Sequence, residues 1–251
     1  MTSRHPDDDA KTSHEGLLTV GRGELVGAST GLAFVALFGA GLISADLLAS
    51  PAFFEVDASS GQIDAFFVDN RPEAVGLSVC HALAAIALLA FGGYVSGVLR
   101  RSDCQSGGLA AVALAGASVA AAFLLLSALL FWTLTRPQLA QADPGTAEAL
   151  LVLSYLAGGP GVALPLAPFL AATSLAGLRA RLLPRSLGRA GLAASVLCLA
   201  SVAGFAGDLT GDARFDPGLG DVGLGLVVAA MLAALAWIAA ASILLRSRRG
   251  L

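Results

Sequence analysis

The feature that most constrains this chain is a series of six long apolar stretches separated by short polar segments. A helix needs about 20 mostly apolar residues to cross roughly 30 Å of hydrocarbon, and each stretch is long enough. The stretches are continuously apolar rather than alternating, and a strand in lipid would leave backbone groups unpaired, so helices are predicted. The predicted spans are Leu25–Ala49, Ala74–Leu99, Gly108–Trp132, Leu150–Leu178, Leu187–Phe205 and Val222–Leu245.

Composition agrees with an all-α membrane protein. Only 13% of the 251 residues are charged and the mean hydropathy is +0.79, whereas about a quarter of a soluble domain is charged. The net charge is −3, so the chain has no overall positive charge that would attract nucleic acid. The three cysteines (Cys80, Cys104, Cys198) have no metal-ligand spacing, and no hydrolase, zinc-protease or P-loop motif occurs. We therefore expect neither a soluble enzyme nor a metal or cofactor site.

The basic residues predict the orientation, because arginine and lysine concentrate in cytoplasmic segments. With six spans, only Arg71, Arg136 and Arg214 fall on one side of the membrane. The other side, which carries both termini, is predicted to be cytoplasmic. The transmembrane domain covers 25–245. It is preceded by a polar tail, 1–24, which is expected to be disordered, and followed by a basic tail, 246–251. The basic residues on the predicted cytoplasmic side are Arg4, Lys11, Arg22, Arg100, Arg101, Arg179, Arg181, Arg185, Arg189, Arg246, Arg248 and Arg249.

The first outer connection contains a predicted short amphipathic helix. Ser59 or Ser60 can cap its start, and Ile63, Phe66 and Phe67 recur at helical spacing on one face. Such a face can lie on the membrane surface or cover the mouth of the bundle. We prefer an interfacial anchor over a lid.

The fourth predicted span is interrupted by glycine and proline. Proline removes a backbone donor and clashes with the preceding turn, so this span is predicted to kink or break. In transporters such breaks build substrate sites near the midplane, which makes a small-solute permease using residues 155–168 the alternative function. Kinked spans without a transport role are also common, and this interpretation is preferred. The candidate residues are Gly158, Gly159, Pro160, Gly161, Pro165 and Pro168.

Two ionisable residues within predicted spans are candidates for a functional role. Asp46 is near the outer end of the first span and His81 is about two turns below the outer end of the second. The two could pair to relay a proton or to sense pH. The preferred interpretation leaves them separate, with Asp46 hydrated at the interface and His81 neutral.

Glycines recur at helix-packing spacing, as Gly27 and Gly31 in the first span and as Gly93 and Gly97 in the second. Small residues four apart let helices approach closely in lipid. Packing within one molecule is the preferred use, and a homodimer face is the alternative.

Three features between Leu25 and Phe205 occur together: the segment from Ser59 to Asn70, the broken fourth span, and the segment from Leu182 to Leu192. Over this stretch the chain resembles a family of uncharacterised bacterial integral membrane proteins, common in actinobacteria, that carry a domain of unknown function. The resemblance implies a six-span protein of the bacterial plasma membrane and supplies no catalytic residue. We therefore expect a non-enzymatic accessory or structural component, with the bilayer and another membrane protein or a second copy as partners; an intramembrane enzyme is least supported.

Overall fold

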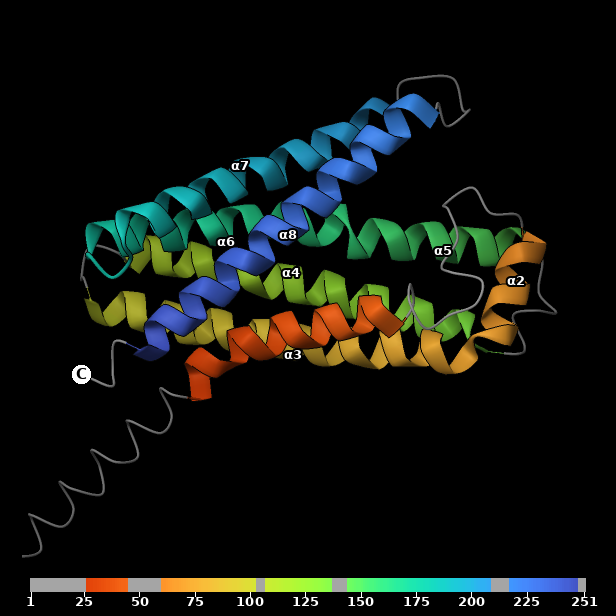
Figure 1. The fold of residues 1–251 in the computed structure, drawn as a ribbon, viewed down its shortest axis with the longest axis horizontal. Coiled ribbons are helices and arrows are strands. Elements are labelled where there is room, and N and C mark those ends of the chain that lie inside the picture. The colour runs from red at the N-terminus through yellow and green to blue at the C-terminus, as the bar shows by residue number, and fades with distance from the viewer. Residues whose placement is uncertain (1–25, 45–59, 103–106, 137–143, 209–216, 248–251) are drawn as a thin grey trace, which may run out of the picture.

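A computed structural model describes residues 26–44, 60–102, 107–136, 144–208 and 217–247, with side chains for all but 60, 64, 144, 202–208 and 217–224. Within these ranges the chain is almost entirely α-helical and has no strand (Figure 1). The first helix is Val26–Ser44. It is followed by α2 (Ser60–Asp69), α3 (Arg71–Ser102), α4 (Gly107–Leu134), α5 (Pro144–Gly158), α6 (Pro160–Arg179), α7 (Arg185–Asp208) and α8 (Pro217–Ser247).

The prediction of an all-helical fold is confirmed for the described residues. Among the described residues, five segments are long and apolar enough to cross a membrane: Val26–Ser44, α3, α4, the stretch Gly145–Arg179 formed by α5 and α6, and the Gly225–Ser247 part of α8. The remaining predicted span, Leu187–Phe205, falls within α7, a helix of 24 residues. The polar tail 1–24 lies outside the described residues.

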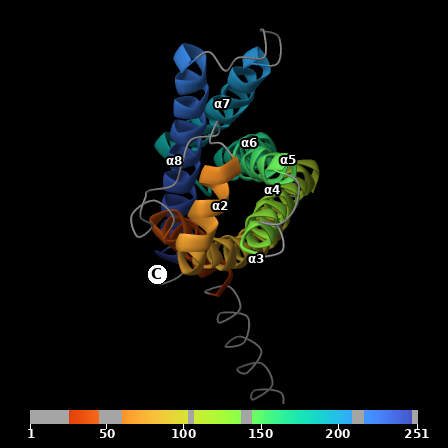
Figure 2. The ribbon, with the colours of Figure 1, turned by 90° about the vertical axis from the view of Figure 1, so that its right-hand side faces the viewer.

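The helices form an elongated bundle in which consecutive long helices run in alternating directions (Figure 1). The packing follows the chain order, with α3 against α4, α4 against α6, α6 against α7, and α7 against α8. Helix α8 crosses the bundle obliquely, and in the view along the bundle α7 and α8 lie to one side of α3–α6 (Figure 2). The first described helix begins, and α8 ends, at the same end of the bundle.

Glycines allow the first helix to approach its neighbours. A β-carbon on Gly27 would meet the Tyr94 ring, and one on Gly31 would meet Ser242 and Phe91. The predicted packing of Gly27 and Gly31 within the molecule is therefore confirmed.

Gly93 and Gly97 behave differently, since no atom lies within 4 Å of a β-carbon placed on either of them. For this pair the preferred prediction of packing within one molecule is wrong. The physical reason is the rotation of α3 about its axis. Gly92 faces α4, where a β-carbon would meet Ala117, and the next residue is turned away by about 100° in a helix of 3.6 residues per turn.

A separate apolar cluster closes one end of the bundle. Ile63, Phe66 and Phe67 of α2 are 1%, 2% and 5% exposed. They pack against side chains of α3, α4 and α5: Ala74, Leu77, Phe131, Leu134, Ala147 and Leu151. The predicted helix is thus present, but the preferred placement of its apolar face on the membrane surface is wrong, because protein side chains bury that face. The packing is that of a cover over the bundle end, the second interpretation given to this segment.

Candidate functional site

The interruption of the fourth predicted span is a single residue. Helix α5 ends at Gly158 and α6 begins at Pro160, with Gly159 between them at φ −91° and ψ −97°. Proline suits the first position of a helix because its missing N–H would have no helical partner there. The two helices continue in the same general direction, so the chain restarts a helix rather than turning back (Figure 1).

Main-chain hydrogen bonds bridge this restart. The Gly159 N–H donates to the Tyr155 carbonyl at 2.8 Å, which completes the last turn of α5. The Gly159 carbonyl accepts from the Val162 and Ala163 N–H groups at 3.2 and 3.0 Å. Gly159 therefore has both its backbone donor and its backbone acceptor paired, and neither is available to a solute.

Neighbouring helices pack closely against the interruption. The Ser127 hydroxyl of α4 donates to the Ser154 carbonyl at 2.9 Å, and a β-carbon on Gly158 would lie 2.6 Å from the same hydroxyl oxygen. A β-carbon on Gly161 would lie 2.8 Å from the Phe123 ring. The glycines of this segment thus fill the role of small packing residues.

One face of the helix after the interruption is buried. Val162, Ala163, Leu166 and Ala167 are each at most 1% exposed. Pro165 and Pro168 lie inside α6, and the helix continues through both. A water-filled cavity lined by freed carbonyls would be expected of a permease. No such cavity is found among the described side chains: residues 158–161 are half-buried, Pro165 is buried and Pro168 is exposed.

His81 is the one ionisable side chain in the described part of the spans that sequence reasoning singled out. It is 6% exposed and stacks on Phe38 of the first helix, with ring centroids 4.8 Å apart and an interplanar angle of 15°. Gly41 makes room for it, since a β-carbon there would lie 2.8 Å from the imidazole Cδ2. His81 therefore fills the seam between the first helix and α3.

The polar surroundings of His81 are sparse. The Phe38 backbone approaches the ring, yet neither ring nitrogen has a hydrogen bond of acceptable geometry to a described residue. Asp46, its predicted partner, lies outside the described residues. No described hydroxyl or carboxylate is thus held against the imidazole, as a general base in an intramembrane enzyme would need.

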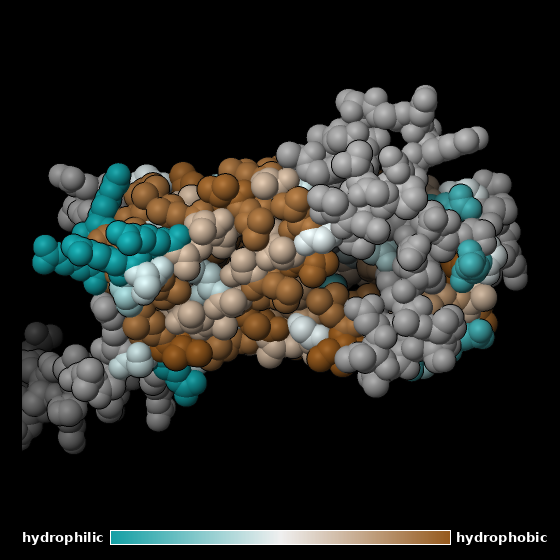
Figure 3. Space-filling view, turned by 45° about the horizontal axis from the view of Figure 1, so that its top comes forward, coloured by the Kyte–Doolittle hydropathy of each residue, from teal (hydrophilic) through white to brown (hydrophobic). Residues whose placement is uncertain are grey.

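Charge separates the two ends of the bundle. Seven exposed arginines lie where α3, α6 and α8 end and α7 begins, and we call this the basic end: Arg100, Arg101, Arg179, Arg181, Arg185, Arg189 and Arg246. The described acidic side chains Asp69, Glu73 and Glu148 lie at the other end, with Arg71 and Arg136. The face shown in Figure 3 has hydrophobic side chains along its middle and hydrophilic side chains at its ends.

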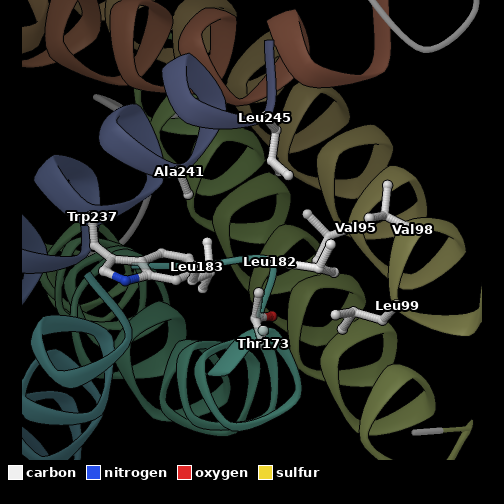
Figure 4. Close-up of a pocket in the computed structure, with 10 residues that line it drawn as sticks. Val95, Val98, Leu99, Thr173, Leu182, Leu183, Trp237, Ala241 and Leu245 are labelled. Atoms are coloured by element: carbon white, nitrogen blue, oxygen red, sulfur yellow. The ribbon is translucent and has the colours of Figure 1, made fainter. Parts of the chain in front are cut away.

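A small apolar crevice opens near the basic end, in a place that sequence reasoning missed. Its volume is about 20 Å³, and Figure 4 shows side chains from three parts of the chain converging on it. We call it the α3–α8 crevice. Its lining includes Val95, Val98 and Leu99 of α3, Thr173 and Gly177 of α6, Leu182 and Leu183 of the following turn, and Trp237, Ala241 and Leu245 of α8.

The floor of the α3–α8 crevice is the turn that ends α6. The Leu182 N–H donates to the Gly177 carbonyl at 2.8 Å and the Arg181 N–H donates to the Leu178 carbonyl at 3.2 Å. This is the Schellman pattern, which requires a left-handed residue after the helix end, and Arg181 supplies it with φ 55°. The turn brings Leu182 and Leu183 under α3 and α8, a proximity that no local sequence pattern reports.

Comparison of the chain with known proteins gives no match to a family model, to a curated protein or to a solved structure. The proposal for its function is therefore argued from the packing, charge and cavities of the molecule itself.

Proposed function

We propose that this chain is a six-span protein of the bacterial plasma membrane, with both termini on the cytoplasmic side, and that it serves as a non-enzymatic structural or accessory component. The proposal counts α7 as the sixth crossing, together with the five segments long and apolar enough to span a membrane. The seven arginines of the basic end support the cytoplasmic assignment of that end.

The observation that carries the accessory role is the close packing of α4 against α5 and α6 on either side of the interruption. A carrier needs an aqueous path to a site near the midplane. Here Ser127 holds the Ser154 carbonyl, and Val162 and Ala163 are completely buried. Helices α4 and α6 also approach closely beyond the interruption, where a β-carbon on Gly116 would lie 2.7 Å from the Pro165 carbonyl oxygen.

Cysteine accessibility tests this proposal. Ser154→Cys and Ala163→Cys are placed singly in a chain whose own cysteines are replaced, and membranes are treated with a hydrophilic, charged methanethiosulfonate reagent. We expect no modification at either position, because Ser154 and Ala163 are 0% exposed. Gly145→Cys, at an exposed position of α5, is the control that reports reagent activity.

Modification of position 154 or 163 in folded protein would reveal a water path to the interruption. That result would overturn the accessory role and favour the small-solute permease. Each variant is compared with the parent by elution volume in detergent, so that modification of unfolded chains is excluded.

A further inference from the structure

The first helix lies along α3 in a seam whose two halves are built differently (Figure 1). In the half nearer the basic end, a β-carbon on Gly27 would collide with the Tyr94 ring, and one on Gly31 would lie 2.8 Å from the Phe91 ring. We call this the near half of the seam. Its glycines let the first helix lie directly against aromatic side chains of α3, and its contacts include no charged group.

The other half, which we call the far half, depends on His81. This side chain is 6% exposed and stacks on Phe38 of the first helix, with ring centroids 4.8 Å apart. A β-carbon on Gly41 would lie 3.0 Å from the imidazole Nε2, so the ring lies against the backbone of the first helix. Beyond the ring, the Ser44 hydroxyl donates a 3.1 Å hydrogen bond to the Glu73 carbonyl.

No charged group of the described residues is placed to compensate a charge on His81. Both ring nitrogens are buried, and neither has a hydrogen bond of acceptable geometry to a described residue. The first helix, Val26–Ser44, and α4 contain no titratable residue. On α3 the Cys80 thiol is adjacent, and the nearest charged residue, Glu73, is about two turns away. Asp46 lies outside the described residues. The other described charged residues at this end of the bundle are exposed: Asp69, Arg71, Arg136 and Glu148.

This environment tolerates a neutral imidazole and opposes a charged one. An imidazolium in the closed seam would be a buried cation without a described counter-ion and with both N–H groups unpaired, which is the most costly form of burial. If the first helix moves away from α3, water or lipid headgroups can solvate the same cation. A falling pH therefore favours separation of the two helices around His81.

We infer that protonation of His81 separates the far half of the seam between the first helix and α3, while the near half stays packed. In the proposed orientation the far half lies toward the outside of the cell, so the device responds to external acidity. It requires neither a carboxylate partner nor the accessory role proposed above. The ratio of open to closed seam should rise by up to about tenfold for each pH unit below ~6.5, the ordinary titration midpoint of a hydrated histidine.

Distances between spin labels test the inference. Ile43→Cys and Val79→Cys, both at exposed positions, place one pair of labels across the far half. Val26→Cys and Gly93→Cys, also exposed, place a second pair across the near half. Each pair is introduced into the full chain without its own cysteines, reconstituted into lipid nanodiscs, and measured by double electron–electron resonance between pH 7.5 and pH 4. We expect a longer distance to appear at low pH for the far pair and an unchanged distance for the near pair.

Substitutions identify the group that responds. His81→Phe keeps an aromatic ring against Phe38 but cannot be protonated, so the far pair should become independent of pH. His81→Gln is the second variant without a titrating group if His81→Phe does not fold. The other two histidines of the chain, His5 and His14, provide the matched control, because their replacement by Asn together should leave the response unchanged. Asp46→Asn should also leave it unchanged.

A far pair whose distance does not change with pH would overturn the inference, as would a change that persists in folded His81→Phe or His81→Gln protein. An equal lengthening of the near pair would show that the whole first helix detaches, and it would also overturn the inference. Loss of the response in Asp46→Asn would do the same, because it would assign the proton to a His81–Asp46 pair. None of these results bears on the accessory role, which reagent access to positions 154 and 163 tests separately.

Discussion

The indole Nε1 of Trp237 donates a 2.9 Å hydrogen bond to the backbone carbonyl of Leu187, which joins the middle of α8 to the first turn of α7. The two residues are 50 positions apart. Gly191, one turn after Leu187, makes the contact feasible, because a β-carbon there would collide with Trp237 and with the Ser174 hydroxyl. This contact fixes the position of α8 along α7 at the depth of the α3–α8 crevice.

Loss of that hydrogen bond should weaken the bundle. Trp237→Phe is expected to lower the free energy of unfolding by about 1 kcal/mol, the usual net value for one hydrogen bond. Gly191→Ala should cost more, because it forces the α7–α8 contact apart. Thermal unfolding in detergent measures both. Trp132→Phe, at a half-exposed site, is the control, and an effect there as large as at Trp237 would contradict the assigned role of the hydrogen bond.

Two glycines of neighbouring helices should respond oppositely to the same substitution. A β-carbon on Gly116 would lie 2.7 Å from the Pro165 carbonyl oxygen and 2.9 Å from the Phe169 nitrogen. Gly116→Ala is therefore expected to destabilise the protein by about 1–3 kcal/mol. Gly93→Ala meets nothing within 4 Å and should be neutral or stabilise by up to about 1 kcal/mol through helix propensity. Equal unfolding midpoints for the two variants would be inconsistent with this packing.

In the turn after α6, glycine should stabilise the protein at position 181 and destabilise it at position 180. Arg181 has φ 55°, a conformation that costs a residue with a β-carbon about 1–2 kcal/mol. Arg181→Gly should raise the midpoint of thermal unfolding. Ala180→Gly should lower it, because Ala180 already has φ −79° and glycine adds entropy to the unfolded chain. A lower midpoint for Arg181→Gly would show that its side-chain contacts outweigh the backbone cost.

The ends of the bundle should be labelled from opposite sides of the membrane. In a chain without its own cysteines, Gly145→Cys lies at the end opposite the basic end and Ser186→Cys at the basic end, and both positions are exposed. A membrane-impermeant maleimide is expected to modify position 145 in intact cells and position 186 only after lysis, because arginine-rich ends stay in the cytoplasm. The reverse pattern would invert the proposed orientation, and labelling of both positions in intact cells would contradict the spanning arrangement.

The helices themselves were largely predictable. In lipid the backbone must satisfy its own hydrogen bonds, so a long apolar run has one available structure. The helix ends fall close to the predicted limits, as for Ala74–Leu99 within Arg71–Ser102. The short helix in the first outer connection was also predictable, because the spacing of Ile63, Phe66 and Phe67 along the chain places them on one face of a helix.

The direction in which each helix points its side chains was not predictable in the same way. Gly92 and Gly93 are adjacent in sequence, yet one packs against Ala117 and the other meets no atom within 4 Å. The apolar face of α2 could have met lipid or protein, and the choice depends on Phe131 and Leu151, which are far away along the chain. Nothing local to either segment reports those partners.

The amino-acid sequence by itself thus accounts for the helical segments and for the placement of the basic residues at alternate connections. Both depend on interactions within a segment or between a segment and the bilayer. Folding of the whole chain settles three further matters: the rotation of each helix about its axis, the close packing at Gly159, and the meeting of α3, α6 and α8 around one crevice. These depend on contacts between segments that are distant in sequence. Such contacts are governed by the shapes of opposing side chains, which the pattern along any one helix does not contain.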